Sequence, residues 1–177
     1  MSQAEYTRAE ASQLTKSQIS AFAESIANQL NYQPCDDILA AIAKIGGKVK
    51  IEDTLLSDPE RSGSLFVDGN NDFTIIVPAH TSPSRDRFTI AHELGHFFVH
   101  YLWKCSKDGT APFKMMALRK DSERVEWEAN WFAAAFLMPS DVFRERHQAL
   151  GGDIEKLASA FCVSQAAAEI RARSLGL

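Results

Sequence analysis

The segment His-Glu-Leu-Gly-His at positions 92–96 contains residue types that can bind a metal ion and transfer a proton, at a spacing that suits both tasks. If this segment is helical, His92 and His96 lie one turn apart on the same face, where two neutral imidazoles can bind one Zn²⁺ ion. Glu93 is then rotated by about 100° from His92, beside the ion rather than on it. A carboxylate in that place can act as a general base on water. The H-E-x-x-H spacing also arises by chance, so it needs support from the rest of the chain.

A catalytic zinc site uses three protein ligands and leaves one position for water, so a third ligand is required. The predicted helix 121–138 offers Glu123, Glu126 and Glu128. On a helical projection Glu126 falls inside the apolar stripe and Glu128 just outside it. Asn130 follows Glu126 by one turn and could hydrogen-bond a metal ligand. We therefore predict Glu126 as the third ligand, with Glu128 as the alternative.

Hydrophobic periodicity predicts the elements that position these residues. Apolar residues recur every three or four positions in the predicted helices and every second position in the predicted strands. The predicted helices cover residues 17–30, 36–45, 82–103, 121–138 and 140–149, with two short ones between 153 and 177. The predicted strands are 48–52, 64–68 and 73–77, and the last two form a hairpin around residues 69–72. These patterns predict an α+β fold with a small three-stranded sheet.

Three regions are expected along the chain. Residues 1–16 are polar and aperiodic, so we expect a flexible N-terminal lead. Residues 17–139 are expected to form the core of the domain, and residues 140–177 a C-terminal helical segment packed on that core. The last two helices resemble a helix-turn-helix, with Cys162 in the turn where glycine is commoner. Arg171 and Arg173 are the only cations on the second of these helices, too few to bind DNA phosphates strongly. We therefore expect this helix to pack on the core or to dock a partner.

Composition and charge limit the class of protein. The chain of 177 residues is 45% hydrophobic and 24% charged, which is ordinary for one globular domain, and its net charge of −4 excludes a general polyanion binder. No apolar run approaches the length of about 20 residues that spans a membrane, and no signal peptide is evident. The three cysteines are few and widely spaced, which predicts a reducing compartment and no disulfide framework. A cytoplasmic protein is expected.

Cys105 lies nine residues after His96, where the chain is expected to leave the motif helix. A thiolate is a good zinc ligand, so Cys105 could occupy the water position as a fourth ligand and hold the site inactive. The alternative is an ordinary loop cysteine with no role at the metal.

The segment after residue 103 concentrates positive charge in a chain that is acidic overall. The cations are Lys104, Lys107, Lys114, Arg119 and Lys120. Trp103 and Phe113 lie among them, and basic groups with aromatic side chains can bind single-stranded DNA by charge and stacking. In that case single-stranded DNA would be an activator. The alternative is a solvated loop.

The sequence does not identify the group that stabilises the developing oxyanion. His80, His100, Tyr101 and His147 have suitable side chains. For His100 the simpler interpretation is a packed histidine or one that supports a ligand, because a catalytic site needs only three protein ligands.

Two long motifs in the right order resemble the ImmA/IrrE family of zinc metallopeptidases. His-Glu-Leu-Gly-His is followed about thirty residues later by Glu-Trp-Glu-Ala-Asn-Trp-Phe-Ala-Ala-Ala-Phe-Leu-Met-Pro at positions 126–139. The family's second motif has the form E-x-x-A-N-x-F-A-A-x-L-L-M-P, and this chain departs from it at Phe136, where leucine is usual. Arg-Phe-Thr-Ile-Ala at positions 87–91 is similar to the family's lead-in. The resemblance covers roughly residues 36–177.

The resemblance implies a zincin-like core, one Zn²⁺ ion and peptidase chemistry. In zincin-like folds the strand before the active helix is an edge that aligns substrate by main-chain pairing, so strand 73–77 is expected to be an edge strand. Members cleave a partner repressor, often a helix-turn-helix protein, and are linked to DNA damage, mobile elements and phage defence in bacteria. A non-proteolytic regulator that binds DNA or a repressor is the alternative. Glu93 favours the peptidase, because a binding protein needs no general base.

Overall fold

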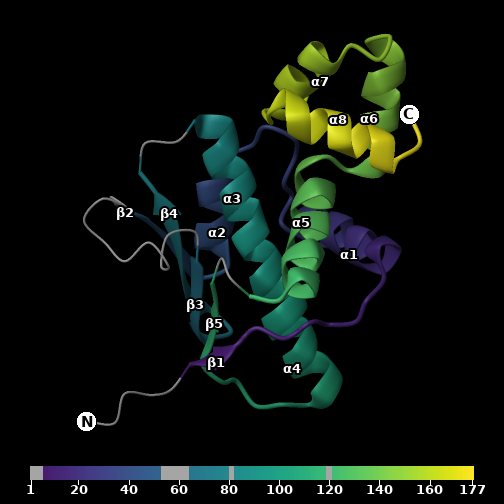
Figure 1. Cartoon of the computed structure of the whole chain (residues 1–177). Coiled ribbons are helices and arrows are strands. Elements are labelled where there is room, and N and C mark those ends of the chain that lie inside the picture. Colours follow the sequence, from purple (N-terminus) through teal and green to yellow (C-terminus); the bar gives the residue numbers. More distant parts are fainter. Residues whose placement is uncertain (1–5, 53–63, 80–81, 119–120) are drawn as a thin grey trace.

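The computed structural model describes residues 6–52, 64–79, 82–118 and 121–177, and Figure 1 shows helices packed against one face of a mixed sheet. The α+β class predicted from the sequence is confirmed. The helices are α1 (Lys16–Gln29), α2 (Ile38–Lys44), α3 (Pro83–Gly95), the π-helix η1 (His96–Leu102), α4 (Trp103–Asp108), α5 (Glu123–Leu137), α6 (Ser140–Ala149), α7 (Ile154–Phe161) and α8 (Gln165–Ser174). The strands are β1 (Thr7–Arg8), β2 (Gly47–Glu52), β3 (Ser64–Gly69), β4 (Asp72–Pro78) and β5 (Met115–Ala117).

The sheet has five strands within the described residues, in the order β1-β5-β3-β4-β2. Strands β3 and β4 form the predicted antiparallel hairpin, and β2 lies parallel to β4. The predicted number of three strands is wrong, because β1 and β5 add to the side of β3. These two strands have 2 and 3 residues, too few for an alternating pattern to show.

The prediction that residues 73–77 form an edge strand is also wrong. Strand β4 lies between β3 and β2, so neighbouring strands use the main-chain groups on both of its sides. Phe73, Ile75 and Val77 are at most 2% exposed. Strand β2 precedes the hairpin in the chain but adds to its outer side, which covers the edge that a substrate would need.

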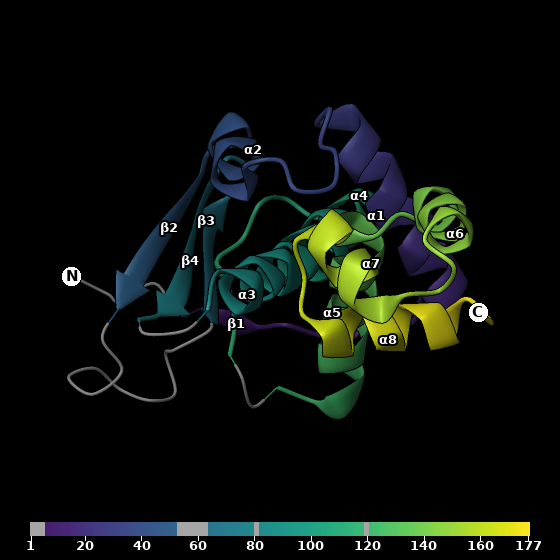
Figure 2. The same cartoon turned by 90° about the horizontal axis from the view of Figure 1, so that it is seen from above.

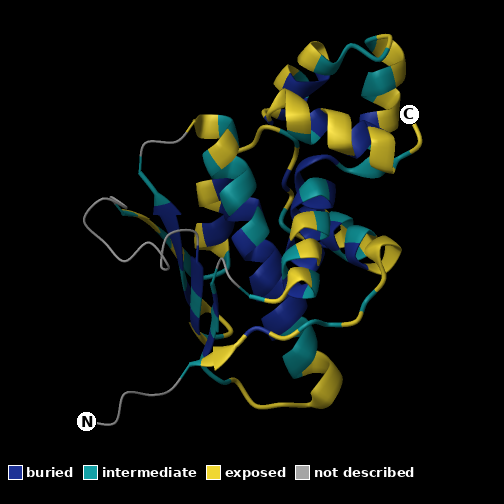
Figure 3. Ribbon diagram, in the orientation of Figure 1, coloured by how far each residue is buried: buried dark blue, intermediate teal, exposed yellow. Residues whose placement is uncertain are grey.

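Helix α3 and the π-helix η1 contact the sheet, and α5 packs on α3 and α1. Seen from above, α3 lies between the sheet and α1, and the buried residues concentrate where α3 and α5 face each other (Figures 2 and 3). Phe97 stacks on Phe73 of the sheet, with ring centroids 4.0 Å apart, and Phe132 of α5 stacks on Phe98 at 5.6 Å. These contacts fix the segment that follows the H-E-x-x-H motif against both the sheet and α5.

Gly95 allows the close approach of α3 to α5. A Cβ atom on this residue would lie 2.9 Å from both the Cα and the carbonyl oxygen of Ala129, which are backbone atoms and cannot yield easily. The glycine of the motif is therefore required by packing between the two helices that hold His92 and Glu126.

We expect Gly95→Ala to destabilise the protein by about 1–3 kcal/mol, the usual cost of overpacking a core. In a helix alanine is intrinsically better than glycine by about 1 kcal/mol, so a net loss would report the clash with Ala129. Chemical denaturation of both proteins measures the difference. Gly69→Ala is the control, because nothing lies within 4 Å of its added Cβ. A Gly95→Ala protein as stable as the original would contradict this account of the crossing.

The described part of the predicted flexible lead contacts the core. Thr7 and Arg8 pair with β5, and the backbone amides of Ser12 and Gln13 donate to the carboxylate of Glu128 at 2.7 and 3.2 Å. Residues 1–5 lie outside the described residues. Polar side chains of this segment also bind the core, since Tyr6 donates to Asp68 at 2.8 Å and Arg8 pairs with Asp121 at 3.2 Å.

The C-terminal segment α6–α8 gathers beyond the end of α5 (Figure 1). Arg171, one of the two cations on α8, is 3% exposed and donates to the carbonyl oxygen of Met138 at 2.9 Å and to Glu24 at 3.3 Å. The Arg171 side chain therefore connects α8 to α1 and to the end of α5. No helix in the described ranges is both long and apolar enough to cross a membrane.

A disulfide joins Cys35 and Cys162, whose Cα atoms are 5.3 Å apart. The cysteines predicted a reducing compartment and no disulfide framework; one disulfide is nevertheless present, so the cysteines no longer favour a reducing compartment. Cys162 ends α7 with a φ of 54°, in the left-handed conformation for which glycine is commoner. Cys35 lies in the connection between α1 and α2. The two residues are 127 positions apart in sequence, so spacing along the chain could not show that they meet.

Candidate metal centre

His92 and His96 lie where α3 passes into η1. Ser82 caps α3 by accepting a hydrogen bond from the Arg85 amide, and Pro83 occupies the first turn, as the sequence predicted. The helical path then continues through η1 and α4 to Gly109, beyond the predicted end at residue 103. Short π-helical turns occur frequently at functional sites. Here the turn starts at His96.

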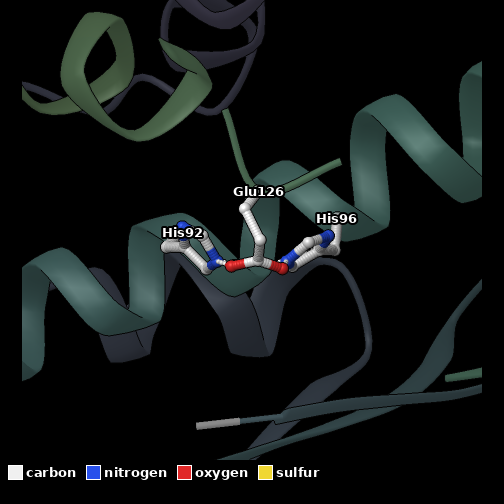
Figure 4. Close-up of side chains that lie close together, drawn as sticks. All are labelled: His92, His96 and Glu126. Atoms are coloured by element: carbon white, nitrogen blue, oxygen red, sulfur yellow. Dashed lines mark hydrogen bonds and ion pairs between the residues drawn. The ribbon is translucent and has the colours of Figure 1, made fainter. Parts of the chain in front are cut away.

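Two helices bring the three predicted ligands together. Figure 4 shows the Glu126 carboxylate between the two imidazole rings. The Nε2 atoms of His92 and His96 are 3.0 Å apart, and the Glu126 oxygens lie 3.2 Å from His92 Nε2 and 3.5 Å from His96 Nε2. These ligand atoms all lie within 4.8 Å of one another, close enough to bind a single ion.

The hydrogen bonds around this cluster fit a zinc ion. Asn130 Oδ1 lies 2.9 Å from His92 Nδ1, and His100 Nδ1 lies 3.0 Å from His96 Nδ1, so both outer ring nitrogens are engaged. The two Nε2 atoms are left to face Glu126, whose buried Oε1 has no hydrogen-bond partner among the described residues. Two imidazole nitrogens and a carboxylate oxygen are a donor set that Zn²⁺ prefers.

The electrostatics of the cluster also favour a cation. Burial, together with the neighbouring His92 and His100, holds the pKa of His96 well below its usual range. Burial would lower the pKa of His92 as well, but the contact with Glu126 and the charge of Glu93 outweigh it and raise that pKa. Carboxylates that favour a proton on His92 equally favour a metal ion in the same place.

Glu93 is 3% exposed and lies on α3 directly after His92. The charge of Glu93 contributes to the raised pKa of His92. The general base predicted from the sequence therefore lies inside the protein, beside the cluster.

Glu128, the alternative third ligand, binds elsewhere. It is completely buried, whereas the side chain of Glu126 is 24% exposed, which reverses the order suggested by the helical projection. Its oxygens lie 3.0 Å from His100 Nε2 and 2.8 Å from Arg124 Nε. Burial would raise the pKa of Glu128, but these hydrogen bonds and that of the Ser12 amide outweigh it and lower the pKa to about 2.

Cys105 does not belong to the group of ligand atoms around His92 within the described part of the chain. It lies on α4 as a free, partly buried thiol. Burial raises the pKa of this thiol, which disfavours the thiolate that would bind a metal. The geometry gives no support to a fourth ligand or a switch at this residue.

The predicted nucleic-acid contacts are partly engaged within the protein. Lys104 pairs with Glu10, Lys114 lies 2.8 Å from Asp68, and Lys107 is exposed. Two further cations lie outside the described residues, namely Arg119 and Lys120. The binding of single-stranded DNA stays a prediction.

The aromatic residues of the same segment face other rings. Trp103 lies 6.0 Å from Phe22 between ring centroids, and Phe113 lies 5.1 Å from Tyr101. Both are partly buried. Side chains packed in this way are poor platforms for stacking bases.

Three of the four candidates for oxyanion stabilisation lie in the described part of the chain. Tyr101 is completely buried against Phe97, His147 lies on α6, and His80 lies outside the described residues. His100 contacts His96, in agreement with the simpler interpretation of a supporting histidine. None of the three candidates in the described ranges belongs to the group of ligand atoms.

An apolar groove of about 730 Å³ begins beside the cluster of His92, His96 and Glu126 and was not foreseen from the sequence. It is lined by α3, α5 and α8, and its apolar residues include Phe88, Trp127, Trp131, Met138 and Ile170. Trp127 and Ile170 are exposed by 48% and 62%. Asn130 lines the groove and also hydrogen-bonds His92, so the groove adjoins the cluster directly.

Comparison with known proteins gives one family and a similar solved structure. A peptidase family model described as the IrrE N-terminal-like domain matches residues 49–173. A Mycobacterium tuberculosis transcriptional regulator is 20% identical with a TM-score of 0.59, and the match covers 86% of this chain and 45% of that one. The chain thus spans less than half the length of that protein, and the likeness shows the fold alone. Among curated proteins, none matches the chain significantly.

Proposed function

Because this chain belongs to the IrrE N-terminal-like family of metallopeptidases, we propose that it is a zinc-dependent endopeptidase acting on a specific protein. The observation that carries the proposal is the convergence of His92 Nε2, His96 Nε2 and the Glu126 carboxylate from two helices. A motif helix packed on a mixed sheet is also what a zincin-like core requires. A structural zinc site would need a fourth permanent ligand, and no such residue joins the cluster in the described ranges.

Each residue of the cluster has a role in this proposal. His92, His96 and Glu126 hold one Zn²⁺ ion, which when bound activates water and polarises the scissile carbonyl as a Lewis acid. Glu93 accepts the proton of the attacking water at its carboxylate and returns it to the leaving amine. Asn130 orients His92 by accepting the hydrogen bond from its Nδ1–H.

The apolar groove suggests how a peptide would bind. It adjoins the cluster through Asn130 and presents two tryptophans, so an extended segment with a bulky apolar side chain would bury that side chain next to the scissile bond. Helix α8 forms one wall, which gives the C-terminal segment a part in substrate selection.

The proposed substrate is a helix-turn-helix transcriptional repressor, cleaved in the cytoplasm of a bacterium during a stress, DNA-damage or phage-defence response. Support comes from the family. Single-stranded DNA is the proposed activator only through the cations after Trp103, and that part rests on sequence alone.

The test combines metal analysis with cleavage. We expect the purified protein to hold one zinc ion per chain and to cut a helix-turn-helix repressor encoded beside its gene at one site, detected by mass spectrometry. An aspartate in place of the apolar residue next to the cut should slow cleavage, because a carboxylate loses more hydration than an apolar side chain when it contacts Trp127 and Trp131. The reaction is followed with and without single-stranded DNA. Binding of the repressor without any cut would favour the non-proteolytic regulator instead.

A further inference from the structure

A chain of hydrogen-bonded side chains leads from the metal cluster into the interior. His96 Nδ1 lies 3.0 Å from His100 Nδ1, and His100 Nε2 lies 3.0 Å from Glu128 Oε2. His96 and His100 are each 1% exposed and Glu128 is completely buried. Polar groups buried this deeply are costly unless each of them is hydrogen-bonded. The donor or acceptor next to each ring nitrogen therefore indicates which nitrogen carries a proton.

Glu128 can only accept hydrogen bonds at this place. Its oxygens receive the backbone amides of Ser12 and Gln13 and the guanidinium of Arg124, at 2.7, 3.2 and 2.8 Å. A carboxylate with three such donors is ionised and has no proton to give. His100 must therefore donate from its Nε2–H to Glu128 Oε2.

This donor assignment sets the tautomer of the next histidine. Arg124 already balances the charge of Glu128, so the buried His100 is taken as neutral. A neutral imidazole that donates from one ring nitrogen accepts at the other, so His100 Nδ1 is an acceptor. His96 then donates from Nδ1–H, and its Nε2 carries the lone pair directed at Glu126 and His92. That is the form in which a histidine binds a metal ion.

We propose that Glu128 and His100 are positioning residues that fix the tautomer and the ring orientation of His96, and that the backbone of Ser12 and Gln13 completes this arrangement. The inference rests on the proposed zinc site and explains why the N-terminal segment crosses α5 at Glu128. For His92 the same task falls to the neutral amide of Asn130, which is exposed. The buried carboxylate gives His96 the more rigid support.

The protein without metal gives a first test that needs no variant. Nitrogen-15 NMR of the histidine rings distinguishes a proton on Nδ1 from one on Nε2. We expect His96 to be protonated on Nδ1 and His100 on Nε2. A His96 ring protonated mainly on Nε2 would overturn the proposal.

Variants of His100 give the second test. His100→Phe keeps a ring but removes the acceptor, and zinc affinity measured by chelator competition should fall about 10- to 100-fold, the usual effect of losing a partner of a metal ligand. His100→Asn places a carbonyl oxygen near the position of Nδ1 and should recover part of this loss. His147→Phe, on α6, makes the same substitution away from the cluster and should bind zinc normally.

The outcomes separate this proposal from the proposed function. If the unmodified protein binds no zinc, the zinc peptidase is wrong. If it binds zinc and folded His100→Phe binds it equally well, only the role of Glu128 and His100 is wrong. A purely structural role would lower the stability of His100→Phe but would leave zinc affinity and the His96 tautomer unchanged.

Discussion

Replacement of Glu93 by glutamine is expected to abolish peptide-bond cleavage while the protein still binds zinc. The amide keeps the size of the side chain but cannot accept the proton of the attacking water. General-base catalysis contributes about 10²- to 10⁴-fold, so the single-turnover rate should fall at least 100-fold. The metal ligands His92, His96 and Glu126 are unchanged, and we expect zinc content and thermal stability to stay close to those of the original protein.

Glu123→Gln is the matched control for this change. Glu123 lies in the first turn of α5 and is exposed, so the same loss of charge should leave the cleavage rate unaltered. Zinc-loaded Glu93→Gln that still cut its substrate at the original rate would remove Glu93 from the mechanism. A loss of zinc in this variant would instead show that Glu93 supports the metal site, and the rate would then say nothing about proton transfer.

Local features of the sequence were sufficient to bring together the two histidines of the candidate metal site. The serine caps at Ser82 and Ser122, each followed by an apolar stripe, identify α3 and α5 as helices. Spacing of four residues then places His92 and His96 on one face, which needs no knowledge of the rest of the fold. Glu126 was a prediction of a different kind, since it required the family motif or an assumption about which face of α5 meets α3.

The errors concern contacts between segments that are distant in the chain. Glu128 is buried, despite lying outside the apolar stripe, because His100, Arg124 and the amides of Ser12 and Gln13 satisfy its charge from three different elements. The short β1 and β5 exist only through pairing with each other and with β3. No local pattern encodes such pairings. The sequence analysis missed the position of β4 between two strands and the Cys35–Cys162 disulfide for the same reason.

Loss of the Cys35–Cys162 disulfide is expected to have the largest effect on stability. The bond closes a loop of 127 residues and connects the segment after α1 to the end of α7. In the chain-entropy model a loop of this length restricts the unfolded chain by about 5 kcal/mol. For a domain of this size, that corresponds to a decrease of roughly 10 °C or more in melting temperature. Thermal denaturation of Cys35→Ser, compared with the oxidised protein, measures the effect.

A reducing agent provides the internal check on this expectation. Dithiothreitol should lower the melting temperature of the unmodified protein to that of Cys35→Ser and should not affect the variant. Cys105→Ser is the control, because that thiol is free, and its melting temperature should fall on reduction as the unmodified protein's does. Equal stability of oxidised and reduced protein would mean that packing of Arg171 against Met138 and Glu24, rather than the disulfide, holds the C-terminal segment on the core.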